Sequence, residues 1–193
     1  ARQPELVRSH PHEGTIVTEA PNQMWGTDAT ATFTEAEGTV TIFAALDHCA
    51  AECVGIHAVK KATRFEALEP IRQGVKQYVG AFSAGSAAGL RLRHDHGGVY
   101  RSDDFQNEIQ FLGIQPSPAF VRQPEGNGCM ERFFRTLKEQ LLWVRRFRDL
   151  DELRAALTDF RDRYNHHWIL QRLNYRTPVQ ARRDFQLALG AAA

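Results

Sequence analysis

The sequence predicts an α/β domain in which helices cover both faces of a central five-stranded mixed sheet. The order of the elements supports this fold class, because three strand-like segments are followed by alternating helical and strand-like segments and then by helices. The length of 193 residues is sufficient to bury a hydrophobic core. The composition, with 42% hydrophobic and 24% charged residues, is ordinary for a globular protein.

The first half of the chain contains a predicted three-stranded meander and a helix. Threonine and aromatic residues are frequent in 24–34, and two further strand-like segments follow at 39–47 and 53–59. Apolar residues then recur at helical spacing from 62 to 79, which predicts a helix. The expected buried face of this helix carries Phe65, Leu68, Ile71, Val75, Tyr78 and Val79.

The second half alternates between strand and helix before it becomes helical. The expected elements are, in chain order, a strand at 90–95, a helix at 102–112, an extended segment at 114–120, a loop at 123–128, a long helix at 129–146 and a further helix at 149–166. Ser102 is a suitable N-cap for the first of these helices. The expected buried face of the long helix carries Met130, Phe133, Phe134, Leu137, Leu141 and Val144.

The chain is expected to hold one main domain with short ends. Residues 1–23 are expected to be an N-terminal extension or linker, 24–184 the domain with its C-terminal helices, and 185–193 a tail. The chain begins at Ala1 and ends in three alanines, so we expect it to be a piece of a longer protein. No segment approaches the roughly 18 apolar residues of a membrane span, and no secretory leader is visible.

Charge and cysteine content narrow the function classes. The net charge is only +1, but residues 131–184 carry 13 of the 24 basic side chains and only 8 of the 23 acidic ones. Such a stretch is either an electrostatic footprint for nucleic acid or a solvated helical face. The three cysteines indicate a reduced, intracellular protein. Cys49, Cys53 and His57 favour buried thiols over a zinc site, because no second pair of cysteines exists.

Three acids lie at the ends of predicted elements. Asp28 interrupts the first strand, Asp95 ends a later strand, and Glu131 lies in the first turn of the long helix. Carboxylate oxygens are the ligands that Mg²⁺ prefers, and two such ions about 3.5–4 Å apart can activate a hydroxyl and stabilise the leaving oxygen of a phosphodiester. The three acids therefore predict a metal site for phosphodiester chemistry. Asp47 also closes a strand and is interpreted as a structural acid.

The spacing of the last two acids is a weak signal by itself. Asp95 and Glu131 are separated by 35 residues, but Asp103 and Glu139 have the same separation. Asp103 and its neighbour Asp104 suit the first turn of a helix, where acids interact favourably with the helix dipole. The residues around the acids must therefore decide between the two pairs.

Four motifs carry a resemblance to a known family. They are, in chain order, WGTDAT, RHDHGGVYRS, PEGNGCMERFFRTLKEQ and RYNHHWILQRLNYRTPVQ. In this order they resemble the DDE recombinases of the retroviral-integrase superfamily, and in particular the bacterial insertion-sequence transposases. The resemblance runs from about Trp25 to Pro178, which is nearly the whole chain.

This resemblance implies an RNase H-like fold with Asp28, Asp95 and Glu131 as catalytic residues and as ligands of Mg²⁺ or Mn²⁺, with two ions expected when DNA is bound. It implies a polynucleotidyl transferase that frees element ends and joins them to target DNA. The expected partners are these two DNAs and further copies of the protein on DNA, with no membrane and no small-molecule cofactor. The expected location is the bacterial cytoplasm, with nucleoid association when DNA is bound. The family's helix-turn-helix region does not precede Asp28 here, so we expect recognition of specific ends to lie outside this chain.

Three residues near Glu131 are candidates for contact with DNA. Arg135 and Lys138 follow the acid by four and seven residues, which places them on the same helical face. The resemblance implies that this face contacts DNA phosphates, and a solvated charged face is the alternative. Asn127, four residues before the acid, is the third candidate.

Histidines and aromatic residues supply further candidates. His94 and His96 flank Asp95 and could support it or hydrogen-bond a substrate phosphate. Aromatic residues near the end of the chain could stack on bases, although packing against the core is the stronger interpretation. These aromatic residues are Tyr164, Trp168 and Tyr175.

Two other functions remain open at this stage. One is an RNase H-like metal-dependent nuclease that uses water as its nucleophile and does no joining. The other is a catalytically inactive DNA-binding or assembly domain, which the presence of all three acids argues against.

Overall fold

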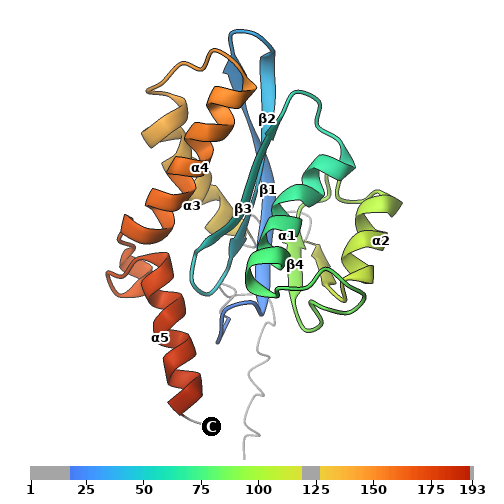
Figure 1. The fold of residues 1–193 in the computed structure, drawn as a ribbon, viewed down its shortest axis with the longest axis vertical. Helices are drawn as coiled ribbons and strands as arrows, with labels where there is room; N and C mark the ends of the chain where they lie inside the picture. The colour runs from blue at the N-terminus through green and yellow to red at the C-terminus, as the bar shows by residue number, and fades with distance from the viewer. Residues whose placement is uncertain (1–17, 119–126, 192–193) are drawn as a thin grey trace, which may run out of the picture.

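The computed structural model describes residues 18–118 and 127–191. Its centre is a five-stranded sheet with the order β3-β2-β1-β4-β5 (Figure 1). The first three strands form an antiparallel meander, and the two short strands β4 and β5 continue the sheet parallel to β1. The predicted five-stranded mixed sheet is therefore confirmed. The strands are β1 (Met24–Thr34), β2 (Gly38–Asp47), β3 (Cys53–Val59), β4 (Arg91–His94) and β5 (Gln115–Pro118).

Helices cover both faces of this sheet, as predicted (Figure 1). Helices α1 and α2 pack on one face, and α3, the π-helical turn η2 and α4 pack on the other. Helix α5 follows a 3₁₀ turn, η3, and lies beyond the end of the sheet (Figure 1). The helical elements are α1 (Arg64–Tyr78), α2 (Asp103–Phe111), α3 (Gly128–Leu137), η2 (Lys138–Leu142), α4 (Leu150–His167), η3 (Gln171–Leu173) and α5 (Pro178–Ala191).

Strand β2 supplies side chains to the hydrophobic cores on both faces. Phe43 and Ala45 belong to the core under α1 and α2. Ile42, Ala44 and Leu46 belong to the core under α3 and α4. Successive side chains of a strand point to opposite faces, so a strand covered on both sides is a continuous apolar segment, as 42–46 is here.

Helix α1 lies very close to β3, and its first turn departs from the prediction. A Cβ atom at Gly55 would lie 2.0 Å from the carbonyl oxygen of Pro70, so the close approach requires glycine. Phe65 was expected on the buried face, but it is 50% exposed and the guanidinium of Arg64 lies over its ring. The burial of α1 begins only at Ala67, so the first turn lies outside the core.

The long helix expected at 129–146 ends early. Helix α3 passes into η2, and the chain leaves the helix after Leu142. Val144, which was expected to be buried, is 71% exposed, and Phe147 fills the core instead. The cause is tertiary: the backbone N–H groups of Glu35 and Ala36, in the β1–β2 turn, donate to the carbonyls of Phe147 and Arg148. These hydrogen bonds hold 147–148 against the hairpin and exclude a continuous helix.

The C-terminal part of the described chain is helical. Residues 185–191, for which the sequence suggested a tail, continue α5. The predicted loop at 123–128 lies largely outside the described residues, which resume at Asn127. Within the described parts of the chain, no helix combines the length and apolar character needed to cross a bilayer.

Candidate active site

Two strands bring Asp28 and Asp95 to corresponding positions on one face of the sheet. The last paired residues of β1 and β4 are Gly26 and Arg93. Asp28 and Asp95 each follow this pair by two residues, and residues i and i+2 of a strand share a face. Asp28 is directly opposite Ala44 of β2, which belongs to the core under α3. The acid at position 28 therefore lies on the face that α3 covers.

Local hydrogen bonds hold both aspartates. An Oδ1 atom of Asp28 accepts a hydrogen bond from the Ala29 N–H at 2.8 Å. Asp95 is exposed just beyond the end of β4, and its Oδ1 accepts from the Gly97 N–H, also at 2.8 Å. A Cβ at Gly97 would lie 2.9 Å from this oxygen, so a side chain there would disturb the turn.

Glu131 reaches the same region from the first turn of α3. This helix packs against β1 and β2 through its apolar face, which includes Met130, Phe133 and Leu137. Glu131 is exposed and lies beside this apolar face, one residue after Met130. The amphipathic pattern of α3 therefore fixes the position from which the third carboxylate approaches Asp28.

The electrostatics of Asp28 connect it with the two other acids. The pKa of the Asp28 carboxyl is raised to about 6, mainly by burial and to a smaller extent by the charges of Asp95 and Glu131. The hydrogen bond from Ala29 and the charge of Lys138 act in the opposite direction on this pKa. Burial and neighbouring like charges both disfavour the ionised form, so the group is costly in the absence of a cation.

The donor set of this group fits a hard divalent cation, because every candidate ligand atom is a carboxylate oxygen. The carboxylates interact but are not gathered into a closed cage. Among the described residues, no three His, Cys, Asp or Glu side chains are arranged to hold a metal ion. Carboxylates without a cation repel one another, so a bound cation would favour a closer arrangement.

Comparison with known proteins agrees with this geometry. Residues 112–178 match the model of the family described as "Integrase core domain". The putative transposase InsD for insertion element IS2E of Escherichia coli K12 is 26% identical over 170 residues, covering 86% of this chain and 76% of that protein. The chain is therefore similar to integrase core domains over 112–178 and to insertion-element transposases over most of its length.

Solved structures of integrase cores have the same fold, which confirms the expected RNase H-like fold. The HTLV-2 integrase catalytic core domain in complex with magnesium has a TM-score of 0.63 at 19% identity, covering 84% of this chain and 97% of that one. An integrase chain of the simian T-cell lymphotropic virus intasome in complex with the PP2A regulatory subunit B56 gamma has a TM-score of 0.69 at 20% identity, covering 88% and 57%.

The three DNA-contact candidates have different surroundings. Lys138 is half-buried, and its effect on the pKa of Asp28 places its charge near the acids. Arg135 is exposed on α3. Asn127 is at the start of α3, but its Oδ1 is buried without a hydrogen-bond partner among the described residues. This oxygen is directed toward Gly26, where a Cβ would lie 3.0 Å away, so contact of this atom with DNA would require the amide to turn.

The two histidines that flank Asp95 also differ. His94 is buried, and its ring stacks on Tyr100 and meets Phe105 edge-on, on the α2 side of the sheet. Its Nδ1 donates to the carbonyl oxygen of Asp95 at 2.7 Å. Burial is the main cause that lowers the pKa of His94. His94 thus fixes the backbone at Asp95, while His96 is exposed.

Two buried basic side chains beside the acids were not anticipated from the sequence. His48 lies over Gly26, where a Cβ would be 2.6 Å from its Nε2. Burial, together with the charges of Arg172 and Arg93, lowers the pKa of His48 to about 4. Arg93 is only 8% exposed, and its Nη1 donates to the Ser117 hydroxyl. The glycine before Asp28 was the only visible signal that another side chain occupies this space.

The acids interpreted as structural have structural partners. Asp103 and Asp104 are in the first turn of α2, and Asp104 forms an ion pair with Arg64. Asp47 is fully buried and accepts from the Ala50 N–H at 2.7 Å. Among the aromatic residues, Tyr164 packs in the core, as favoured, whereas Tyr175 is 70% exposed, which contradicts packing for that residue.

Proposed function

We propose that Asp28, Asp95 and Glu131 hold Mg²⁺ or Mn²⁺ and that the domain cuts DNA strands and joins them to a second duplex. The observation that carries this proposal is the pKa of Asp28, which burial and the two other carboxylates raise to about 6. A divalent cation would relieve this repulsion. The magnesium in the HTLV-2 integrase core supports the choice of metal.

Different residues of the chain would bind the metal ions, hold the DNA phosphates and position the backbone. The three carboxylates would bind two ions when DNA is present, and those ions would supply activation of a hydroxyl and stabilisation of the leaving oxygen. Lys138 and Arg135 would hold phosphates beside the acids, and His94 would keep the Asp95 backbone in place. In joining, a DNA 3′-oxygen forms a bond to phosphorus, the bond to the former 3′-oxygen breaks, and a new 3′-hydroxyl is released.

The proposed partners follow from the relatives. We propose that the domain spans 24–184 and acts on element ends and target DNA, because the relative in Escherichia coli is named as a transposase of an insertion element. The intasome among the structural neighbours supports self-association on DNA. The bacterial relative also supports the bacterial cytoplasm as the compartment.

A joining assay separates this proposal from a water-using nuclease. The protein is incubated with pre-cut ends of its element, a target duplex and Mg²⁺ or Mn²⁺, and joined products are measured. We expect joined products with 3′-hydroxyl ends and none with 3′-dideoxy ends, because the terminal hydroxyl is the nucleophile. Nicking that is indifferent to the dideoxy ends, without any joining, would establish the nuclease instead. Glu131→Gln should abolish the reaction in either case.

A further inference from the structure

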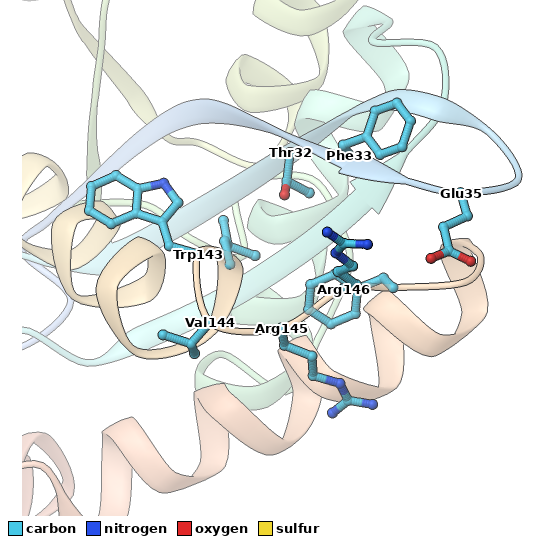
Figure 2. Close-up of a pocket in the computed structure, with 9 residues that line it drawn as sticks. Thr32, Phe33, Glu35, Trp143, Val144, Arg145 and Arg146 are labelled. Atoms are coloured by element: carbon cyan, nitrogen blue, oxygen red, sulfur yellow. The ribbon is translucent and has the colours of Figure 1, made fainter.

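A cavity of about 520 Å³ lies between the β1–β2 hairpin and the segment that links η2 to α4 (Figure 2). We propose that this cavity is a second binding site for a DNA strand, in which Arg146 contacts a phosphate and the indole of Trp143 stacks on a base. The proposal rests on the proposed function, since it extends the DNA path away from the three carboxylates.

The walls of the cavity are fixed in place. The Glu35 N–H donates to the Phe147 carbonyl at 3.0 Å, and the Ala36 N–H donates to the Arg148 carbonyl at 2.9 Å. Phe147 itself is 1% exposed and anchors the linking segment in the core. A site with a rigid frame loses little conformational entropy when a ligand binds.

Trp143 offers a free aromatic surface. It is 70% exposed, although tryptophan is usually a largely buried residue. Its neighbour Val144 is also exposed, at 71%. An exposed indole at the edge of a cavity suits base stacking, which accepts any base because every base has an aromatic face.

Two arginines at this site have different environments. The Nη2 atom of Arg145 lies 2.7 Å from the carboxylate of Glu152, and its side chain points away from the cavity toward α4 (Figure 2). Arg146 points toward β1, beside Thr32 (Figure 2). Within the described part of the chain, Arg146 has no hydrogen bond or ion pair. One carboxylate, Glu35, also lines the cavity, and Arg146 is the arginine directed toward the strand that forms its wall (Figure 2).

Strand β1 carries residues of both the cavity and the candidate active site. Thr32 follows Asp28 by four residues, so both are on the α3 face, about 13 Å apart at 3.3 Å per residue. Strand β4 pairs only with Met24–Gly26, so within the described residues no strand covers the outer edge of β1 beyond Gly26. The charge of Lys138 lies near the Asp28 end of this path.

These features favour a nucleic acid over a protein partner. An unpaired guanidinium, an exposed indole and an open path to the phosphodiester site together match a phosphate backbone with bases. The distance of about 13 Å corresponds to about four base-pair steps of rise in a duplex. The strand would therefore cross the acids and the cavity in a single bound state.

The test is binding of a single-stranded oligonucleotide in EDTA, which allows no metal-dependent chemistry, followed by anisotropy and by tryptophan fluorescence. Trp25 is fully buried and Trp168 is half-buried, so quenching would report mainly on Trp143. We expect Trp143→Ala to weaken binding by about tenfold and to remove most of the quenching. Arg146→Ala should reduce the salt dependence by about 0.7 in logarithmic slope, the value for one phosphate of a single strand.

Matched variants elsewhere on the surface serve as controls. Arg183→Ala removes the same charge from an exposed position on α5, and Phe111→Ala removes an aromatic ring that is 51% exposed on α2, on the other face of the sheet. Both should bind as the unaltered protein does. Unchanged affinity, slope and quenching in Trp143→Ala and Arg146→Ala would overturn the proposal. So would sedimentation showing that Trp143→Ala abolishes self-association of the DNA-free protein without changing DNA binding.

The result is separable from the fate of the proposed function. A protein that binds strands through Trp143 and Arg146 but never cuts or joins DNA would retain this site and lose the proposed activity. A protein that joins DNA normally in both variants, with unchanged binding, would retain the activity and lose this site.

Discussion

Several ionisable side chains around the candidate active site are buried, and their described neighbours do not compensate for the cost of burying a charge there. Burial raises the pKa of Asp28 to about 6 and lowers the pKa of His48 to about 4. Burial also lowers the pKa of Arg93, which forms no ion pair with a described residue. Buried charges are normally paired, so such a concentration is typical of a site that binds a charged ligand.

The raised pKa of Asp28 predicts how stability changes with pH. The folded value of about 6 lies above the reference value of 3.8, so folding favours the protonated form of the Asp28 carboxyl. The stability of the folded state that depends on this protonated form is fully present below about pH 4 and is lost as pH rises through 6. The difference corresponds to about 3 kcal/mol. In EDTA, Asp28→Asn should therefore raise the melting temperature at pH 7.5 relative to the unaltered protein, with a much smaller effect at pH 4.

Mn²⁺ should reverse this order of melting temperatures at pH 7.5, so that the unaltered protein melts above Asp28→Asn. Bound metal stabilises the folded state by about 2.7 kcal/mol at 100 times its dissociation constant, and the gain should grow from pH 5.5 to 7.5 as the carboxyl loses its proton. Asp28→Asn and Asp95→Asn should lose most of the gain, whereas Asp103→Asn, with its acid in the first turn of α2, should keep it. Equal gains in all three variants would show that the metal binds elsewhere.

The candidate acids could be found from the sequence, but their surroundings could not. Asp28 and Asp95 are close to recognisable strand ends, and local motifs identify them. The place of His48 depends on how the β2–β3 turn folds back over Gly26, and the burial of Arg93 depends on the register of β1 with β4. Both are long-range properties that no local pattern encodes.

At the scale of elements, boundaries set by local chemistry were predicted and boundaries set by tertiary contacts were not. Helix α2 begins after Ser102, whose side chain caps the Phe105 N–H, as expected. The end of the helix at Leu142 instead depends on hydrogen bonds from Glu35 and Ala36, more than 100 residues earlier in the chain. Helical periodicity continued past the true end because it carries no information about the hairpin.

The attachment of α5 to the rest of the domain is a second feature of the elements that could not be predicted from the sequence. Arg182 is 6% exposed and forms ion pairs with Asp47 and Glu52, which are also buried. Its guanidinium lies 4.1 Å from the ring centre of Tyr78, and the Tyr78 hydroxyl donates to Glu52. One arginine thus joins α5 to the turn after β2 and to α1.

Removing this arginine should destabilise the protein strongly. Arg182→Ala leaves two buried carboxylates without their cation, so we expect a loss of about 3–5 kcal/mol in the free energy of unfolding, measured with urea. The double variant Arg182→Met with Glu52→Gln should recover part of this loss, because it removes a buried charge as well as its partner. A loss below about 1 kcal/mol in Arg182→Ala would show that α5 does not depend on this contact.

At the scale of the whole molecule, the fold separates a structural face from a candidate DNA-binding face. The sheet was predictable because β2 and the helices had clear apolar patterns and the order of elements admitted few topologies. Both faces of the sheet have a packed core, but only the α3 face also carries the described acids, Lys138 and the cavity beside Arg146. The basic residues that are concentrated late in the chain thus include Lys138 and Arg146 on this face.

The salt dependence of DNA binding tests whether the α3 face is the one that contacts DNA phosphates. Neutralisation of each phosphate on a duplex contributes about 0.9 to the slope of log affinity against log salt concentration. Arg135→Ala and Lys138→Ala should each lower the slope by about one unit and weaken binding equally for unrelated sequences, if each meets one phosphate. Lys76→Ala is the matched control, because this exposed lysine lies on α1, across the sheet. The slopes are measured with one duplex between 50 and 200 mM salt in EDTA.

If all three variants share the slope of the unaltered protein, Arg135 and Lys138 belong to a solvated face and the DNA path must cross the domain elsewhere. If Lys76→Ala alone changes it, the two faces of the sheet have been assigned in the wrong order.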